Sequence, residues 1–282
     1  MQRTKKDGNM PFPRALVGWC LLAILCVVIV ALGRYFGWDE PVHTETAIPN
    51  DRFAVRAAAA AGDEEAREVM MLKIACLTFD DGPSNHTQEI LDILAEEEVP
   101  ATFFVTAQEA NMEYYPLLKT AVEQGNQIAL HSATHRYSKI YASAQNFWLD
   151  LKELRQALQP YVDVDGIHWL RFPGGSTNTV SHRYGGSGIM KQLIAETGDH
   201  GYEWIDWNVC GEDATASHPN AAQILKNVQR DSEGRDICVV LLHDTKATGE
   251  TVKALPDIIR WYKENGYHFC TVEEMYETRD GG

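Results

Sequence analysis

Residues 73–83, KIACLTFDDGP, join a short apolar run to two adjacent aspartates and a Gly-Pro turn. The run KIACLTF (73–79) has the length and composition of a buried β-strand. Asp80 and Asp81 follow where this strand would end. Because neighbouring like charges repel, one of two such carboxyl groups is usually protonated or paired with a cation. A surface turn is the simplest interpretation of this pair, and a metal ligand beside a general base is the alternative.

The rest of the chain alternates strand-like and helix-like segments in the same way. QEILDILAEEE (88–98) repeats its apolar residues at helical spacing, and ATFFVTA (101–107) is again strand-like. The pattern predicts further strands at 127–131, 168–172, 202–209, 236–243 and 268–272, and further helices at 116–125, 144–161, 188–197, 221–230 and 251–266. Such alternation indicates a parallel sheet with helices outside it. We therefore expect an α/β fold, a (β/α) barrel that is incomplete or distorted and has about seven strands, preceded by one transmembrane helix.

The segment before residue 72 has a different character. Residues 15–33, ALVGWCLLAILCVVIVALG, contain no charged side chain over 19 residues, close to the ~20 that a membrane-spanning helix needs. Basic residues precede this run, so its amino end is expected in the cytoplasm. The sequence thus predicts a cytoplasmic tail (1–14), a transmembrane signal anchor (15–36), an extracytoplasmic stalk or linker (37–71) and a folded domain (72–282).

This division places the protein in the cell membrane as a single-pass protein, with its folded domain extracytoplasmic. A cleaved signal peptide, which would leave a secreted protein, is the alternative. Its apolar region would normally be shorter, at ~7–15 residues, and no A-x-A cleavage site follows the run closely.

Composition excludes one large class of partner. The formal net charge of −15 over 282 residues argues against nucleic acid, because phosphate neutralisation needs clustered Lys and Arg. The six cysteines form neither a CxxC pair nor a zinc-type spacing. We interpret Cys76, Cys210, Cys238 and Cys270 as buried free thiols, although an exported domain would also permit disulfides.

Ionisable residues recur where the predicted strands end. In (β/α) barrels the chemistry lies at the carboxyl ends of the strands, so such side chains converge on one mouth. The residues concerned are Asp80, Asp81, His131, His135, Arg171, Asp206, Asp213 and His243.

The H-x-x-x-H spacing at 131–135 suits a metal. Two imidazoles can lie on one side of an ion, and one carboxylate completes a three-ligand site with open positions. Zn²⁺ is the first choice for this ligand set, and the same set also suits Co²⁺, Ni²⁺ or Fe²⁺.

Five segments in order resemble the motifs of the polysaccharide deacetylases, the enzymes with a NodB homology domain that form carbohydrate esterase family 4. The segments are TFDDGP (78–83), HSATH (131–135), RFPGG (171–175), WNVCGED (207–213) and LLHD (241–244). The resemblance covers roughly residues 72–275.

The resemblance implies a role for most of these residues. Asp80 matches the catalytic base, and Asp81, His131 and His135 match the ligands of one divalent metal ion. His243 matches the general acid, Asp213 the carboxylate that orients it, and Arg171 the arginine that braces the base. The backbone N–H of Gly174 matches the donor to the acyl oxygen. Asp206 is an alternative to Asp213, and Trp207 either lines the substrate site or belongs to the core.

Two departures from the family pattern alter the expected groove. Ala214 follows Asp213 where the family usually has tryptophan, and RFPGG has Gly174 in place of an aromatic residue. Each removes one aromatic side chain from the substrate wall.

The resemblance implies metal-dependent hydrolysis of N-acetyl groups on the amino sugars of an extracellular polysaccharide, with peptidoglycan as the first choice. Chitin, an exopolysaccharide and O-acetylated xylan are alternative substrates. A catalytically silent wall-binding module is an alternative of a different class. The expected partners are the polysaccharide and, through the N-terminal helix, the membrane.

Overall fold

The computed structural model describes residues 73–280, and the predicted tail, anchor and stalk lie outside them. Within 73–280, no helix combines the length and the apolar character that crossing a bilayer requires.

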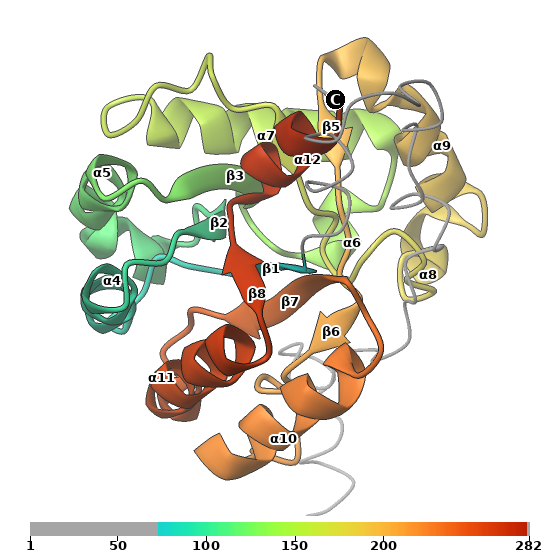
Figure 1. Ribbon diagram of the computed structural model, residues 1–282. Coiled ribbons are helices and arrows are strands. Elements are labelled where there is room, and N and C mark those ends of the chain that lie inside the picture. The colour runs from blue at the N-terminus through green and yellow to red at the C-terminus, as the bar shows by residue number, and fades with distance from the viewer. Residues whose placement is uncertain (1–72, 281–282) are drawn as a thin grey trace, which may run out of the picture. The chain divides into compact units, whose positions relative to one another are not determined.

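The described residues form one parallel sheet flanked by helices (Figure 1). The order of the strands is β5-β4-β3-β2-β1-β7-β6, and β8 pairs with β1 outside this path. Every strand pairing is parallel, as predicted. The sheet curls, but its end strands β5 and β6 are not paired with each other, so the predicted incomplete barrel is confirmed. The strands are β1 (Lys73–Asp80), β2 (Ala101–Thr106), β3 (Gln127–Ser132), β4 (Trp169–Leu170), β5 (Glu203–Trp204), β6 (Val209–Cys210), β7 (Ile237–His243) and β8 (Tyr267–Phe269).

One predicted strand is wrong. The segment 202–209 was expected to be continuous, but it contains β5 and β6, which lie at opposite ends of the sheet. The chain leaves one edge after Ile205, whose N–H donates to Leu170 O, and joins the other edge at Asn208, whose N–H donates to Val239 O. The Asn208 side chain also bonds the backbone of β7, so this residue attaches the segment to the other edge of the sheet.

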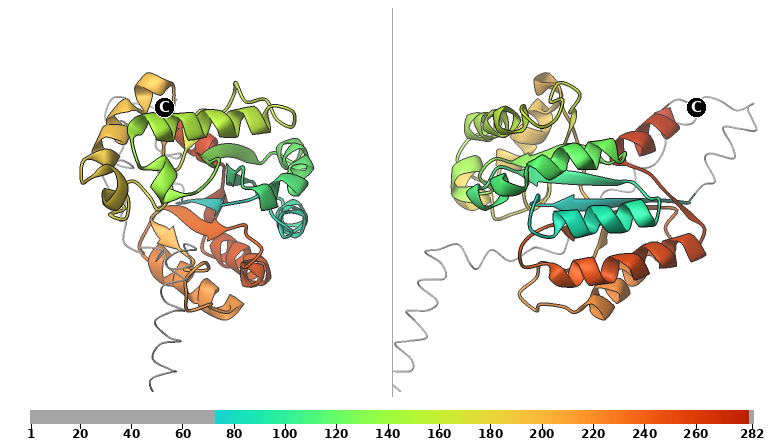
Figure 2. Two further views of the ribbon diagram at one scale, coloured as in Figure 1. Left: turned by 180° about the vertical axis from the view of Figure 1, so that it is seen from behind. Right: turned by 90° about the vertical axis from the view of Figure 1, so that its left-hand side faces the viewer.

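Helices surround the sheet on its outer side (Figure 2). The six predicted helices are present as α4 (Thr87–Glu96), α5 (Pro116–Glu123), α7 (Ala144–Leu158), α9 (Ile189–Glu196), α10 (Ala221–Ser232) and α11 (Gly249–Glu264). Shorter elements that the periodicity did not predict lie in the loops, together with a C-terminal helix: η1 (Glu109–Tyr114), α6 (Tyr137–Ile140), α8 (His182–Gly185), η2 (Gly198–His200) and α12 (Val272–Asp280).

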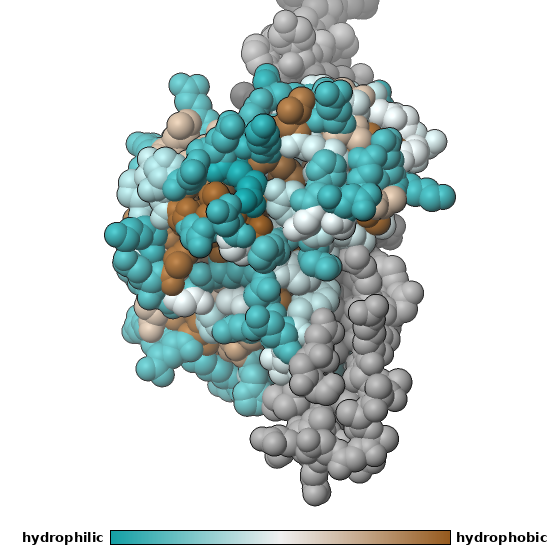
Figure 3. Space-filling model, turned by 90° about the horizontal axis from the view of Figure 1, so that it is seen from above, coloured by the Kyte–Doolittle hydropathy of each residue, from teal (hydrophilic) through white to brown (hydrophobic). Residues whose placement is uncertain are grey.

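Alternate residues of β1 face two different cores, since successive side chains of a strand point to opposite faces. Ala75, Leu77 and Phe79 belong to a large cluster shared with the helices. Ile74 and Cys76 belong to a smaller cluster, which also contains Met275 of α12. The face in Figure 3 is mainly hydrophilic with small apolar patches, consistent with a composition that has 23% charged residues.

The four cysteines among residues 73–280 are free thiols. Cys76 Sγ lies 3.6 Å from Cys270 Sγ. Cys210 and Cys238 are buried, and burial is the first cause that raises the pKa of each thiol, to about 12 for Cys210. These thiols are therefore protonated at neutral pH and act as small apolar side chains.

Candidate active site

The carboxyl ends of β1, β3 and β7 bring the predicted residues together. Asp80 is the last residue of β1 and His243 the last of β7, and they are partners in the register of these two strands. His131 is in β3, next to β2. The alternation along β1 also directs Asp80 to the inner face, together with Thr78, Cys76 and Ile74. These side chains therefore lie at the carboxyl ends of the strands, as the sequence predicts.

Asp81, His131 and His135 form a cluster that could hold a metal ion, because one ligand atom from each lies within 4.8 Å of the others. Asp81 Oδ1 is 3.6 Å from His131 Nε2 and 3.4 Å from His135 Nε2. His131 Nδ1–H donates to Arg171 O at 2.8 Å, which leaves Nε2 as the nitrogen with a free lone pair. The ligand atom of His131 is therefore free to bind a cation, and it lies within reach of those of Asp81 and His135.

The buried Asp81 Oδ1 has no hydrogen-bond partner within residues 73–280. An unsatisfied buried carboxylate oxygen is costly, and a cation is the partner that two imidazole nitrogens and a carboxylate oxygen together fit. The residues present therefore fit the metal that the sequence predicts.

The ionisation of the cluster also suits metal binding. Burial raises the pKa of Asp81, but His135, His131 and His243 outweigh it and the net shift is downward. Burial is the main cause that lowers the pKa of His131, and it exceeds the opposing effect of Asp80. Both shifts, of the Asp81 pKa and of the His131 pKa, are in the direction that favours the metal-binding forms, carboxylate and neutral imidazole.

Two of the three candidate ligands have an unusual backbone. Asp81 has φ +73° and His135 has φ +50°, a left-handed region that non-glycine residues seldom adopt. Backbone and side-chain contacts hold both: Asp81 O accepts hydrogen bonds from Thr106 and Asn111, and His135 N–H donates to Ser132 Oγ. Strain supported in this way is common at functional sites.

Arg171 is completely buried beneath the site and is the counter-ion of Asp80. Its NH1 group donates to Asp80 Oδ1 at 2.8 Å and to Thr78 Oγ1 at 2.7 Å. Its Nε and NH2 groups donate to the carbonyls of Ile205 and Asp206. The guanidinium group also lies 4.1 Å from the ring centroid of Phe104. Each guanidinium nitrogen of Arg171 thus has an acceptor, and the side chain fixes one oxygen of the Asp80 carboxylate.

His243 and Asp213 form a second pair on the other side of the site. His243 Nδ1–H donates to Asp213 Oδ1 at 2.9 Å, and Asp213 Oδ2 accepts from His243 N–H and from Thr251 Oγ1. Burial alone would lower the pKa of His243, but Asp213, Asp81 and Asp80 raise it to about 9. His243 is therefore an imidazolium at neutral pH, with its Nε2–H available as a proton donor.

The structure distinguishes Asp213 from Asp206, which the sequence left open. Asp206 Oδ1 accepts from Ser176 N–H at 2.9 Å, and Oδ2 accepts from the Ser176 hydroxyl group. Asp206 therefore holds the 173–176 loop, whereas Asp213 contacts His243. Trp207 is 5% exposed and lies in the smaller core. Its ring centroid is 5.6 Å from Arg171 Cζ, so Trp207 packs under the site.

Gly174 lies in the loop after β4 with φ +75°. Its N–H donates no hydrogen bond to any other residue of the 73–280 part. The neighbouring Gly175 N–H, by contrast, donates to Phe172 O at 2.7 Å. An unpaired N–H at this position is suited to a substrate oxygen.

Two buried aspartates that support the site were not predicted. Asp150 of α7 accepts hydrogen bonds from Ser132 Oγ, Ala133 N–H and Thr134 Oγ1, at 2.6–2.7 Å, and so organises the turn between the two histidines. Asp244 accepts from the hydroxyl groups of Ser84 and Thr87 across the loop that follows Asp81. The sequence contained a signal for each of them. Asp150 is an acidic residue on the buried face of helix 144–158, and Asp244 is an acidic residue directly after His243.

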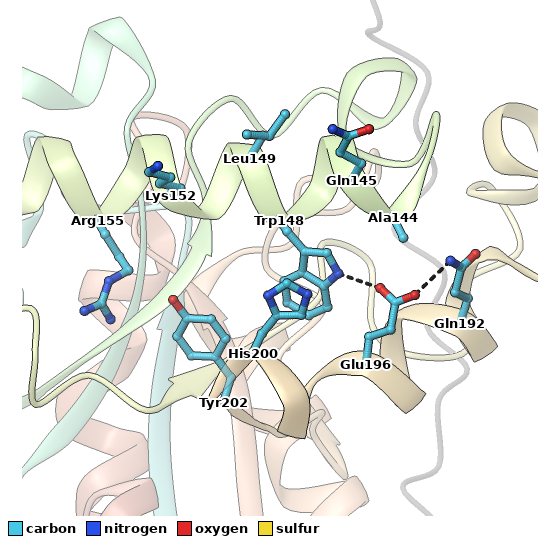
Figure 4. A pocket seen from close by; sticks show the side chains of 10 residues that line it. All are labelled: Ala144, Gln145, Trp148, Leu149, Lys152, Arg155, Gln192, Glu196, His200 and Tyr202. Atoms are coloured by element: carbon cyan, nitrogen blue, oxygen red, sulfur yellow. Dashed lines mark hydrogen bonds between the residues drawn. The ribbon is translucent and has the colours of Figure 1, made fainter.

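A separate pocket of about 690 Å³ lies between α7 and the segment from α9 to β5 (Figure 4). Its polar side chains bond one another: Trp148 Nε1–H and Gln192 Nε2 both donate to the Glu196 carboxylate, at 2.8 Å. The Trp148 ring also stacks on His200 with centroids 4.0 Å apart. These contacts brace α7 against α9, and none of the predicted site residues lines this pocket.

Comparison with known proteins identifies the same family as the motifs. The family model of polysaccharide deacetylases matches residues 70–187. A peptidoglycan-N-acetylglucosamine deacetylase of Bacillus cereus is 31% identical over 209 residues, which are 72% of this chain and 70% of that protein. A bifunctional xylanase/deacetylase of Pseudobutyrivibrio xylanivorans is 32% identical over 219 residues. These residues are 77% of this chain but only 33% of that longer protein.

A solved structure agrees with these relatives. The catalytic domain of a peptidoglycan N-acetylglucosamine deacetylase from Eubacterium rectale superimposes with a TM-score of 0.66 and 38% identity, covering 71% of this chain and 88% of that one. The chain shares its sequence with a relative over most of that relative's length, and it also shares the fold. This chain is therefore a member of the polysaccharide deacetylase family.

Proposed function

We propose that this protein is a metal-dependent hydrolase that removes N-acetyl groups from the amino sugars of peptidoglycan. The observation that carries the proposal is the convergence of three groups at one mouth: the Asp80–Arg171 pair, the cluster around Asp81 and the His243–Asp213 pair. Amide hydrolysis needs a base, an electrophilic centre for the acyl oxygen and an acid for the leaving amine. Each group supplies one of these needs.

Asp81, His131 and His135 would hold one divalent ion, with Zn²⁺ as the first choice for this ligand set. When bound, such an ion polarises an acyl oxygen and lowers the pKa of a water molecule. Asp80 accepts the proton of the attacking water, and Arg171 orients the Asp80 carboxylate through its hydrogen bond to Oδ1.

On the acid side, the His243 imidazolium donates its Nε2 proton to the leaving nitrogen of the sugar. Asp213 holds the ring by its Nδ1–H and stabilises its charge. The Gly174 N–H donates to the acyl oxygen as negative charge develops there.

Peptidoglycan is favoured because relatives named as peptidoglycan-N-acetylglucosamine deacetylases include the Eubacterium rectale domain and the Bacillus cereus protein. A second candidate, the O-acetyl groups of xylan, is favoured by the bifunctional xylanase/deacetylase. Ester hydrolysis needs the same groups, so only the shape of the groove would separate these substrates.

The test is an acetate-release assay on peptidoglycan, N-acetylglucosamine oligomers and acetylated xylan, with Asp80→Asn as the inactive control. We expect acetate from the first two substrates with the wild-type protein. Acetate from xylan alone would replace the proposed substrate. No acetate from any of the three with metal bound would overturn the enzyme proposal in favour of a silent binding module.

We also propose that residues 15–36 remain as an uncleaved anchor that holds the domain outside the membrane, near the cell wall. The support is the 19-residue run without charge and the basic residues before it. Alkaline extraction of membranes should leave the full-length chain in the pellet. A shortened soluble chain would show that a signal peptide has been cleaved.

A further inference from the structure

Two thiols meet between β1 and the end of β8, away from the candidate active site. Cys76 Sγ lies 3.6 Å from Cys270 Sγ, although 194 positions separate the two residues in the sequence. Cys76 is in β1, and Cys270 directly follows β8. The last register pair of these parallel strands is Ala75 with Phe269, so Cys76 and Cys270 are the next pair along. Their side chains therefore lie on the same face of the sheet.

The backbone around these two thiols has the spacing that a disulfide bond needs. Neighbouring strands lie about 4.8 Å apart, and the Cα atoms that a disulfide joins are typically about 4.4–6.8 Å apart. The two sulfur atoms would have to approach from 3.6 Å to about 2.0 Å, the length of an S–S bond. Rotation of the two side chains, rather than movement of the strands, can close this gap.

The two thiols differ in exposure, and this difference sets the order in which they can react. Cys76 is completely buried in the smaller core cluster, where its Sγ also lies 3.7 Å from Met275 Sδ. Cys270 packs against the same cluster but is only partly buried. The hydrogen bond with Cys270 and burial raise the pKa of the Cys76 thiol. A reagent in solution therefore reaches Cys270 first, and Cys76 reacts second.

We propose that Cys76 and Cys270 form a disulfide bond in an oxidising environment and so fasten the C-terminal segment to the central strand β1. The oxidant is a small disulfide of the glutathione class. The Cys270 thiolate attacks one sulfur atom of this disulfide and releases the first thiol. The Cys76 thiolate then attacks Cys270 Sγ in the mixed disulfide and releases the second thiol. The two protons of the protein thiols pass to the released thiolates, so the protein pair is oxidised and the small disulfide is reduced.

The bond would hold a short segment at the end of the described chain. β8 has three residues and pairs with β1 outside the main path of the sheet. α12 follows and contributes Met275 to the smaller core cluster. A disulfide restricts the unfolded chain more strongly as the closed loop grows, and this one would close a loop across 194 positions. The bond should therefore stabilise the fold, whatever reaction the active site performs.

The first test maps the thiols of the full-length chain, which is purified with reductant and then incubated with oxidised glutathione. Unfolding in an alkylating reagent, digestion and mass spectrometry show which thiols have remained free. We expect one linked pair of peptides, which contain Cys76 and Cys270, and alkylated Cys210 and Cys238. Alkylation of both Cys76 and Cys270 would overturn the inference, as would a glutathione adduct that persists on Cys270.

The second test measures the Tm of the oxidised chain with and without reductant. We expect reductant to lower the Tm of the wild type by at least about 5 °C, because a disulfide that closes a long loop stabilises a fold. Cys270→Ala should show no such difference. Each protein is compared with itself, so any loss of packing caused by the substitution cancels.

Cys238→Ala is the matched control, because it removes a thiol as deeply buried as Cys76 but leaves the pair intact. Cys238 is the register partner of Ala75 and belongs to the large core cluster, on the opposite face of the sheet from Cys76. The difference in Tm should therefore persist in Cys238→Ala. No difference in the wild type, or an equal difference in Cys270→Ala, would overturn the inference.

Hydrogen exchange of the backbone amides tests whether the bond fastens the C-terminal segment. Oxidation should slow the exchange of the amides in α12 by about tenfold, because the helix can no longer detach from β1 locally. The amides of α5, which packs against β3, should change less. Exchange in α12 that is as fast in the oxidised as in the reduced chain would contradict this role of the bond.

Discussion

Arg171 NH1 lies 2.8 Å from Asp80 Oδ1, and the two residues are 0% and 3% exposed. A buried ion pair needs further hydrogen bonds to offset its desolvation, and the guanidinium group donates three more, to Thr78, Ile205 and Asp206. The pair therefore links the floor of the barrel to the residue proposed as the base.

Arg171→Met should destabilise the fold by about 3–5 kcal/mol, because it leaves the Asp80 carboxylate buried without its partner. Turnover should fall by at least about 100-fold, because Asp80 loses the hydrogen bond that orients its carboxylate. Urea unfolding and acetate release check the two effects. The control is Arg260→Met, which breaks an exposed pair with Asp257 and should cost less than about 1 kcal/mol. Equal losses for both variants would contradict this role of Arg171.

The pH dependence of turnover should report His243. As the acid, His243 acts in its protonated form, so activity is present below its pKa of about 9 and is lost as the pH rises through that value. Asp213→Asn removes the main charge that raises this pKa. The basic limb of the profile should then move to lower pH, by about one unit or more. Glu212→Gln, next to Asp213 in the chain, should leave the limb in place. A basic limb that does not move in Asp213→Asn would exclude His243 as its source.

Asp150 should control metal affinity although it touches no metal ligand atom. Its carboxylate organises residues 132–134 between His131 and His135. Asp150→Ala should therefore weaken metal binding by about 10- to 100-fold, the usual effect of removing a group that orients ligands. Competition with a chelator measures this affinity. Glu153→Gln, on the exposed side of the same helix, is the control and should bind metal as the wild type does.

Gly82 should not tolerate a side chain, because a Cβ atom there would lie 2.5 Å from Asp244 Oδ2. Gly82→Ala should destabilise the fold by about 1–3 kcal/mol, the usual cost of overpacking. The cost should be smaller in an Asp244→Ala background, and denaturant unfolding of the four proteins gives the coupling. Gly166→Ala is the control, since its nearest atom would be 3.9 Å away. Additive costs at Gly82 and Asp244 would contradict the contact.

Local patterns in the sequence predicted the parallel sheet, its helices and the end of the sheet where the ionisable residues gather. The spacing of the apolar residues distinguishes strands from helices. Because the carboxyl ends of parallel strands lie at one end of the sheet, Asp80 and His243 are then expected to lie close together. Contacts between distant residues were not predictable in this way. Asp244 bonds Ser84 across 160 positions, and Asp206 bonds Ser176 across 30. The same limitation explains the error at 202–209, where both parts are strands but Ile205 bonds β4 and Asn208 bonds β7.

The most direct test compares Asp80→Asn with Asp81→Asn by metal content and acetate release. We expect Asp80→Asn to bind one divalent ion per chain, as the wild type does, but to release no acetate. Asp81→Asn should lose the ion, because it removes the negative charge from the oxygen that faces both His131 and His135. If instead Asp80→Asn loses the metal while Asp81→Asn keeps it, the roles assigned to the two adjacent aspartates are reversed.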